Sequence, residues 1–221
     1  MIVLEDVHKR YRTDRGLGKW VLQGISLQIS RHCNVGLIGR NGAGKSTLLR
    51  LIGGMDIPTR GRVEHHCRVS WPLGLGAGLQ GSLTGRQNAK FVCRLHGLNG
   101  EIPEKLAFIQ EFTELGDAFD NPIKTYSSGM SARLKFALSL IFNFDVYLVD
   151  ELTAVGDALF KKKCKQAFDQ LAGQAGLIMV SHDEAALKNY CQAGIWLHQG
   201  QVYWFDDINE AVASYRKSIA A

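Results

Sequence analysis

The sequence predicts an α/β fold in which a mostly parallel sheet, with an antiparallel β flank, is interrupted by an all-α insertion. Helical periods alone fill residues 81–144, whereas strand and helix patterns alternate on both sides of that segment. We therefore expect a single domain, 1–221, with a core of about 1–80 and 145–221 and a helical subdomain of about 81–144. Three runs are apolar on both faces, as is typical of buried parallel strands: VGLIG (35–39), VYLVD (146–150) and LIMVS (177–181).

Shorter signals complete the order of elements. IVLEDV near the N-terminus and ISLQI (25–29) alternate apolar and polar residues, which favours an antiparallel flank. The stretch IWLHQGQVYWF predicts a hairpin that turns at Gln199-Gly200. Apolar periods or capping motifs predict the helices: Lys45 to Ile52, Thr84-x-x-Gln87 toward Leu95, Glu104 to Leu115, Phe160 to Leu171, and the segment capped by Ser181-x-x-Glu184.

Composition narrows the class of protein without naming a partner. The chain is 46% hydrophobic, which is sufficient for one sizeable core. Its five cysteines are scattered and odd in number, which favours reduced thiols over a disulfide framework. The net charge of +5 is a modest excess that a nucleotide, a nucleic acid or an anionic membrane surface could explain. No stretch approaches the ~20 apolar residues that span a bilayer, and two acids interrupt the first apolar run, so we expect a soluble chain without a signal peptide.

The segment GRNGAGKST, residues 39–47, matches the phosphate-loop pattern G-x-x-x-x-G-K-[ST] between a predicted buried strand and a predicted helix. Its glycines let backbone N–H groups wrap the phosphates, Lys45 can reach the β- and γ-phosphates, and the Ser46 hydroxyl can bind Mg²⁺. The motif alone does not separate kinases, GTPases and ATPases. The candidate nucleotide-binding residues of this loop are Gly39, Arg40, Asn41, Gly42, Ala43, Gly44, Lys45, Ser46 and Thr47.

Polar residues follow the C-terminal ends of two of the buried strands, where ligands collect in parallel sheets. Asp150 ends VYLVD and is placed to hold the Mg²⁺ shell, and Glu151 beside it is the candidate general base that polarises the attacking water. His182 follows LIMVS and is the candidate contact to the γ-phosphate. These residues predict a nucleoside triphosphate and Mg²⁺ as ligands.

A second turn suited to an anion opens the segment TYSSGMSARLKFALSL (125–140). Ser127, Ser128 and Gly129 precede an amphipathic helix, and helix starts present unpaired N–H groups and the positive end of the macrodipole. The phosphate loop already has a helix start of its own. A second phosphate-reading turn therefore needs a separate explanation.

The resemblance that explains it is to the ATP-binding cassette of ABC transporters, and it covers nearly the whole chain. It is carried by an ordered set of motifs: Tyr11, GRNGAGKST, Gln80, YSSGM, VYLVDE, AVGD and VSHD. The resemblance implies a P-loop ABC nucleotide-binding domain that pairs head to tail, so that Ser127, Ser128 and Gly129 of one subunit close on the ATP of the other. It also implies that Tyr11 stacks on adenine. Gln80 is implied as a catalytic link between Mg²⁺, the attacking water and the helical insertion, and Asp157 as a dimer-interface residue.

Two segments depart from the usual family pattern. The signature is commonly Leu-Ser-Gly-Gly-Gln, whereas here Tyr126 replaces Leu, Ser128 replaces the first Gly and Met130 replaces Gln. A long segment, SWPLGLGAGLQGSLTGRQN, stands in place of a short Pro-Gln run around Gln80. Together with KTYSSGMSARLKFALSL and DELTAVGDALFKKKC, it closely resembles the ATPase subunit of bacterial capsular polysaccharide exporters. The short helix expected at 207–217, with little chain beyond it, favours that type over O-antigen ATPases that carry an extra carbohydrate-binding domain.

The resemblance implies an ATPase that powers export of a lipid-linked capsular polysaccharide across the bacterial inner membrane. Its implied partners are a second copy of the chain and a separate integral membrane permease of the ABC-2 type, with the chain peripheral on the cytoplasmic face. Contact with nucleic acid or directly with the sugar is not expected. The alternatives that stay open are an O-antigen or teichoic acid exporter ATPase and, less favoured, a soluble ABC ATPase that acts on nucleic acid.

Overall fold

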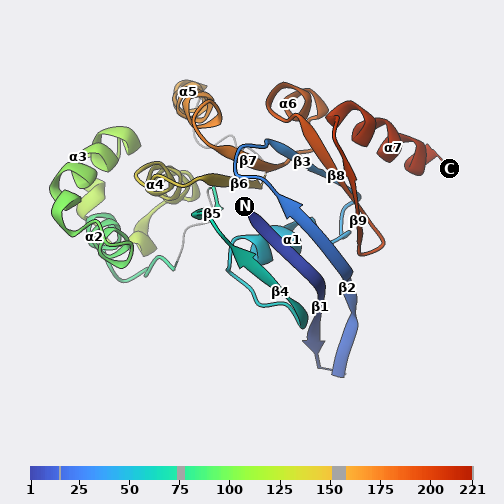
Figure 1. Ribbon diagram of the computed structural model, residues 1–221. Helices are drawn as coiled ribbons and strands as arrows, with labels where there is room; N and C mark the ends of the chain where they lie inside the picture. The colour runs from blue at the N-terminus through green and yellow to red at the C-terminus, as the bar shows by residue number, and fades with distance from the viewer. Residues whose placement is uncertain (15, 74–77, 151–157, 221) are drawn as a thin grey trace. The chain divides into compact units, whose positions relative to one another are not determined.

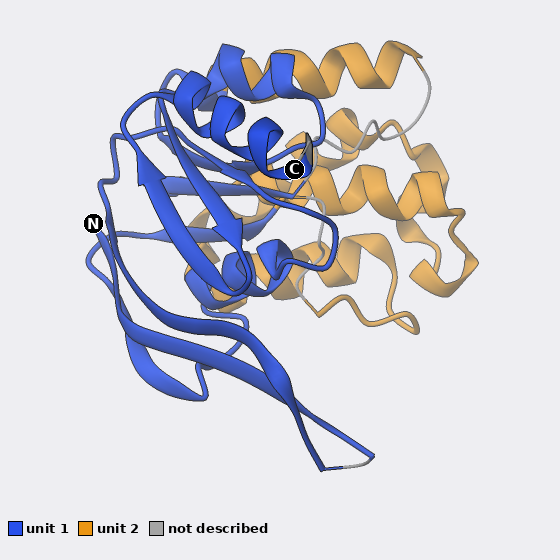
Figure 2. Cartoon of the chain, turned by 90° about the vertical axis from the view of Figure 1, so that its right-hand side faces the viewer, with its two compact units in different colours: residues 1–72, 144–152, 171–221 blue, residues 73–143, 153–170 orange. Residues whose placement is uncertain are grey.

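The computed structural model divides into two compact units (Figures 1 and 2). The residues that it describes are 1–14, 16–73, 78–150 and 158–220. The first unit is made of Met1–Pro72, Phe144–Leu152 and Leu171–Ala221, and the second of Leu73–Asn143 and Thr153–Gln170. Segment 153–170, which the sequence analysis assigned to the core, groups with the helical segments. No helix in the described ranges combines the length and apolarity that crossing a membrane requires.

An antiparallel sheet in the first unit has the strand order β2–β1–β4. Its strands are β2 (Gly16–Ile29), β1 (Ile2–Thr13) and β4 (Arg60–His65). Several register shifts interrupt the pairing of β1 with β2. Leu4 of β1 is buried, and after a register shift at Asp6, whose φ is 46°, alternate burial resumes at Val7 and continues to a lysine, Lys9, which is only 8% exposed.

A second sheet in the same unit has the order β5–β6–β7–β3–β8–β9. Its strands are β5 (Val69–Pro72), β6 (Val146–Asp150), β7 (Gly176–Val180), β3 (Val35–Ile38), β8 (Ala193–His198) and β9 (Gln201–Phe205). All neighbouring pairs are parallel except β8 and β9. This confirms the mostly parallel sheet, and the antiparallel pairing of β1 with β2 and β4 confirms the predicted flank. The predicted hairpin turn is also confirmed, since Gln199 and Gly200 both have positive φ, 49° and 79°.

One apolar core joins the two sheets through helix α1 (Lys45–Ile52), which has the predicted bounds. Leu48, Leu49 and Ile52 of α1 are fully buried in this core. The other face of β3 and β8 is covered by α6 (Glu184–Tyr190) and α7 (Ile208–Ala220), because Gly36 and its neighbours on the sheet lie against side chains of both helices. Helices therefore cover the parallel sheet on both faces, and this is why its strands are apolar throughout.

The cap of α6 differs from the predicted one. Asp183, and not Ser181, is the N-cap residue, and its carboxylate accepts a hydrogen bond from the Ala185 N–H at 2.9 Å. Ser181 instead accepts from the Asp183 N–H at 3.0 Å. A carboxylate one residue before the helix has the shorter reach to the free N–H groups, so the predicted cap was wrong by two positions.

The second unit is helical. Its helices are α2 (Gly85–Leu95), η1 (Asn99–Glu101), α3 (Ile102–Thr113), η2 (Gly116–Asp120), η3 (Ile123–Thr125), α4 (Ser128–Leu140) and α5 (Ala158–Ala172), the last of these up to Gln170. The ring of Phe112 lies at its centre, with centroids 6.1 Å from Phe136 and 5.7 Å from Phe160. The capping box of Thr84 and Gln87 is present as predicted.

Helix α3 ends two residues earlier than the sequence suggested. Glu114 takes the left-handed conformation, with φ 56°, and this terminates the helix before Leu115. The Glu114 carboxylate is then held by Lys163 of α5 at 2.8 Å. Lys163 is therefore half-buried, while Lys161, Lys162 and Lys165 of the same run are exposed, as expected of a solvated face.

Candidate nucleotide-binding site

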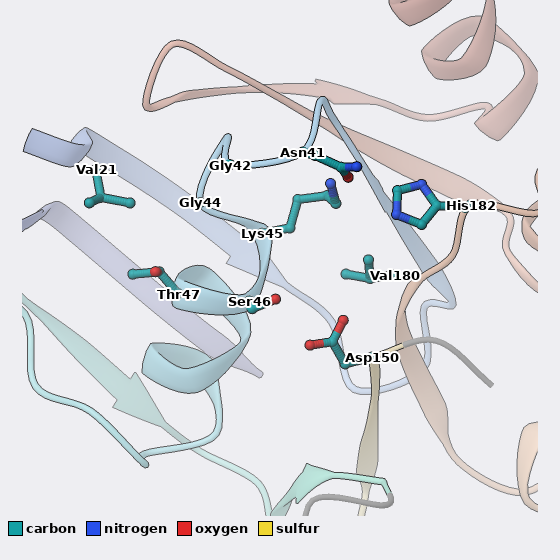
Figure 3. Close-up of a pocket in the computed structure, with 10 residues that line it drawn as sticks. All are labelled: Val21, Asn41, Gly42, Gly44, Lys45, Ser46, Thr47, Asp150, Val180 and His182. Atoms are coloured by element: carbon teal, nitrogen blue, oxygen red, sulfur yellow. The ribbon is translucent and has the colours of Figure 1, made fainter. Parts of the chain in front are cut away.

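A cavity of about 480 Å³ opens at the C-terminal edge of the parallel sheet in the first unit (Figure 3). The loop before α1 forms one wall, and the ends of β6 and β7 form the other. Its lining residues are Val21, Asn41, Gly42, Gly44, Lys45, Ser46, Thr47, Asp150, Val180 and His182. Residues from four separate parts of the sequence thus converge on one space, which is where ligands bind in open α/β sheets.

The loop between β3 and α1 requires glycine at two points. Gly44 has φ 107°, in a region that other residues rarely adopt, and no side chain caps the helix that it precedes. The first N–H groups of α1 therefore lack a side-chain cap and can bind an anion. A Cβ on Gly39 would lie 2.5 Å from the Leu197 carbonyl oxygen, so only glycine lets the loop leave β3 this close to β8.

We expect Gly39→Ala to lower the stability of the protein by ~1–3 kcal/mol, because the added methyl displaces backbone and not a flexible side chain. Its affinity for ATP should fall as well, since the displaced backbone is the start of the loop. Thermal unfolding and nucleotide titration measure the two effects. Gly100→Ala is the control, because no atom lies within 4 Å of the added Cβ there. Equal behaviour of the two variants would contradict the close approach.

The Lys45 side chain bends back over the loop. Its Nζ donates to the carbonyl oxygens of Gly39 at 2.7 Å and Arg40 at 3.1 Å. These two carbonyl oxygens orient the ammonium at the mouth of the cavity. A triphosphate in the cavity meets a positioned cation. Gly39, Arg40 and Ala43 do not line the cavity, and they act in the loop through their backbone.

Ser46 and Asp150 bring a hydroxyl and a carboxylate to the same cavity from α1 and β6. Figure 3 shows the two groups directed toward one another. Oxygen donors of this kind are the ligands that Mg²⁺ prefers, and the ion commonly takes one or two protein groups together with phosphate oxygens. The residues present therefore fit a magnesium ion bound with a nucleotide.

His182 lines the cavity from the turn after β7, and its side chain is exposed. The Ser181 and Asp183 contacts described above fix the backbone of this turn. The imidazole can therefore reach a phosphate from a defined position. Val21 of β2 and Val180 of β7 also line the cavity, and sequence reasoning missed both. Apolar strand residues carry no signal of this kind in a sequence.

Three further predicted site residues are Glu151, Asp157 and Gln80. Glu151 and Asp157 fall outside the described residues. Gln80 belongs to the second unit, where Asn88 fixes its backbone from both sides. The Gln80 N–H donates to the Asn88 Oδ1 at 2.8 Å, and the Asn88 Nδ2 donates to the Gln80 carbonyl at 3.1 Å. Asn88 lies in the first turn of α2 and is 1% exposed, so it anchors the backbone at Gln80 to that helix.

Tyr11 lies on β1 beside α1 and does not line the cavity. Its hydroxyl donates to the Asp56 carboxylate at 2.9 Å and to the Thr47 Oγ1 at 3.5 Å. The side chain is 39% exposed. Sequence reasoning identified Tyr11 and Thr47 but missed Asp56.

The Ser127-Ser128-Gly129 turn begins α4 in the second unit. The Ser127 Oγ caps the helix by accepting from the Met130 N–H at 3.2 Å. Gly129 is open: the nearest atom to an added Cβ is the Ser127 Oγ at 3.9 Å. The departure at Tyr126 has a structural role, because its hydroxyl donates to the Ala118 carbonyl at 2.7 Å and ties the turn to η2.

A glycine-rich loop and helix start, with an acid and a histidine at the ends of neighbouring parallel strands, define a P-loop nucleotide-binding domain. The family model described as ABC transporter matches residues 22–154. The chain belongs to the ABC transporter family, and it is an ATPase of that family.

Several known proteins are similar over nearly the whole chain. The polysialic acid transport ATP-binding protein KpsT of Escherichia coli is 51% identical, covering 99% of this chain and 100% of the relative. The capsule polysaccharide export ATP-binding protein CtrD of Neisseria meningitidis serogroup B is 46% identical, covering 97% of this chain and 98% of the relative. A dimeric ATP-binding cassette in a post-hydrolysis state, bound to ADP and Pi, superposes with a TM-score of 0.75 at 22% identity, over 94% of this chain and 99% of that chain. That likeness concerns the fold alone.

Proposed function

We propose that the chain is the ATP-hydrolysing subunit of an ABC-2-type exporter that moves a capsular polysaccharide, carried on a lipid, across the bacterial inner membrane. The single observation that carries this proposal is the 46–51% identity, over almost all of the chain, to proteins named for polysialic acid transport and capsule polysaccharide export. The geometry of the cavity supports the ATPase part of it. The cavity brings a cation, a hydroxyl, a carboxylate and an imidazole to one space, and these groups suit a nucleoside triphosphate.

Within this proposal the predicted site residues have separate roles in ATP hydrolysis. The loop N–H groups and Lys45 bind the phosphates, and Ser46, Asp150 and Gln80 hold the magnesium ion, which offsets phosphate charge when bound. Glu151 is the general base that takes a proton from the attacking water, and His182 contacts the γ-phosphate. Tyr11 stacks on the adenine ring.

We propose further that two copies of the chain act together. The helix start at Ser127, Ser128 and Gly129 reads the γ-phosphate bound by the partner, and Asp157 lies at the interface between the copies. The open surface at Gly129, in the first turn of α4, supports this role, because a phosphate can approach the glycine without displacing a side chain.

The homodimer then drives a separate membrane permease from the cytoplasmic face of the inner membrane. In this proposal the dimer closes and reopens to drive the permease. The chain therefore has no need to bind the sugar, and it does not bind nucleic acid. The related alternatives are export of O-antigen or of teichoic acid, which use the same chemistry in the ATPase.

An export assay tests the proposal. In an encapsulated bacterium that lacks the ATPase subunit of its capsule exporter, expression of this chain with its own permease should restore surface polysaccharide. The Lys45→Ala variant should leave the polymer inside the cell. Failure to restore the capsule, with O-antigen or teichoic acid export restored in the matching deletion strain, would favour the alternatives.

A further inference from the structure

We propose that Asp56, a residue outside every motif of the site, is the positioning residue that sets the ring of Tyr11 for the nucleotide base. The inference rests on the proposed role of Tyr11 as the adenine platform. It concerns what holds the platform in place. The observations that carry it are three hydrogen bonds in the first unit that converge on the Asp56 carboxylate, one of which is also an ion pair with Lys9.

The anchor of this network is an ion pair that is largely removed from solvent. Lys9 is 8% exposed, and its Nζ lies 2.5 Å from the Asp56 Oδ1 and 2.7 Å from the Ile57 carbonyl. The Ile57 N–H donates to the same Asp56 oxygen at 2.8 Å. A lysine in the buried phase of β1 needs such acceptors, since an unpaired buried charge is costly. The Asp56 carboxylate is thereby locked in one orientation.

The second oxygen of this locked carboxylate accepts from the Tyr11 hydroxyl at 2.9 Å. The hydroxyl also reaches the Thr47 Oγ1 at 3.5 Å, and the Lys9 Nζ lies 4.8 Å from the ring centroid. Tyr11 is 39% exposed, so without these contacts its side chain would sample several rotamers. Contacts at the hydroxyl and against the ring restrict it to one.

The network also ties the ring to the phosphate loop. Thr47 lies in the first turn of α1, directly after Lys45 and Ser46, and Asp56 lies in the segment that follows the end of α1. The first turn of α1 and the segment that follows the helix therefore both contact the Tyr11 hydroxyl. When the ring is already ordered, binding does not have to pay the conformational entropy of ordering it. The affinity for a ligand with a nucleotide base is therefore higher.

The charge of Asp56 suits this role. Burial alone would raise the pKa of its carboxyl, but the hydrogen bonds from Lys9 and Tyr11 outweigh burial and lower the pKa below its usual value. The carboxylate is ionised at neutral pH and accepts from the tyrosine hydroxyl. A hydrogen bond to a charged acceptor is stronger and more directional than one between neutral groups.

The test compares two ligands, ATP with magnesium and inorganic tripolyphosphate with magnesium, by titration calorimetry. Tyr11→Ala should weaken ATP binding at least about fivefold, because the stacking surface is lost, and leave tripolyphosphate binding unchanged. Tyr11→Phe keeps the ring and removes the contact to Asp56, and it should weaken ATP binding about threefold. Asp56→Asn should produce a similar loss, and the double variant should bind ATP no more weakly than either single variant, because both remove one interaction.

The outcomes separate this inference from the proposed function. Normal ATP binding by Tyr11→Phe and Asp56→Asn, with weakened binding by Tyr11→Ala, would overturn the positioning role alone. Additive losses in the double variant, or equal losses for ATP and tripolyphosphate, would overturn it too. Normal ATP binding by Tyr11→Ala would instead remove the adenine platform from the proposed function. Tyr11→Phe keeps the test decisive if Asp56→Asn fails to fold.

Discussion

Replacing Glu151 by Gln is expected to leave ATP binding intact and to slow turnover at least about 100-fold. Gln is the same size as Glu but cannot accept the proton of the attacking water. ATP should therefore persist in the site, and the protein should accumulate as a closed dimer with two nucleotides. Phosphate release and size-exclusion chromatography with ATP and Mg²⁺ measure the two effects.

Glu184→Gln is the matched control for this variant. Glu184 begins α6, close in sequence to His182, and its carboxylate pairs with Arg216 and not with any residue that lines the cavity. The same chemical change there should leave turnover nearly normal. Near-normal turnover in Glu151→Gln itself would exclude the general-base role.

The second large effect is expected at Gly129, in mixed dimers that combine Gly129→Glu with Lys45→Ala. The atom nearest to a Cβ added at Gly129 is the Ser127 Oγ, at an ordinary contact distance of 3.9 Å. A Glu at this position would place a carboxylate against the phosphates of the partner subunit. This substitution is cleaner than one at Ser127, since Ser127 also caps α4 and its loss costs about 1 kcal/mol of stability.

The arrangement of the two lesions decides the result. When they lie on opposite subunits, one site keeps both an intact loop and an intact turn, so one ATP per dimer should still be trapped and hydrolysed. When they lie on the same subunit, each site carries one lesion and both should be inactive. Sites built within a single chain predict the reverse pattern, with activity only when both lesions share a subunit. Counting trapped nucleotide per dimer distinguishes the two models.

Much of the fold could be predicted because its strands and turns have strong local signals. The runs at 35–39, 146–150 and 177–181 are apolar on both faces only because helices cover the sheet on both faces. The capping box at Thr84 and the turn at Gln199-Gly200 depend on neighbouring residues alone. The order of strands in the sheet had no such signal, since β3 lies between β7 and β8, which are remote from it in the sequence.

The two helix ends that were predicted wrongly show where reasoning from neighbouring residues fails. Glu114 ends α3 in a left-handed conformation that favours glycine, and its carboxylate is paired with Lys163 of a different helix. The apolar period of α3 predicts a helix that continues to Leu115, but the helix ends earlier, where Glu114 contacts a different helix. At α6, two adjacent polar residues competed for one cap, and the sequence alone did not rank Asp183 above Ser181.

The candidate site could be predicted where a motif exists and not where the contact is tertiary. The loop, Asp150 and His182 meet in one cavity as their positions in the sequence predicted. Val21 and Asp56 had no motif to mark them. One signal was available, however: Lys9 occupies the buried phase of an alternating strand, and a lysine there indicates an acidic partner elsewhere in the chain.

The central claim is that each subunit supplies a cradle for one ATP and a lid for the other. Specific ATPase activity, followed over a dilution series that extends below the dimer dissociation constant, tests this claim most directly. We predict that activity per chain falls with dilution as the dimer separates, while a tandem fusion of two copies keeps its activity. Constant activity per chain in the dilute, monomeric protein would contradict the account.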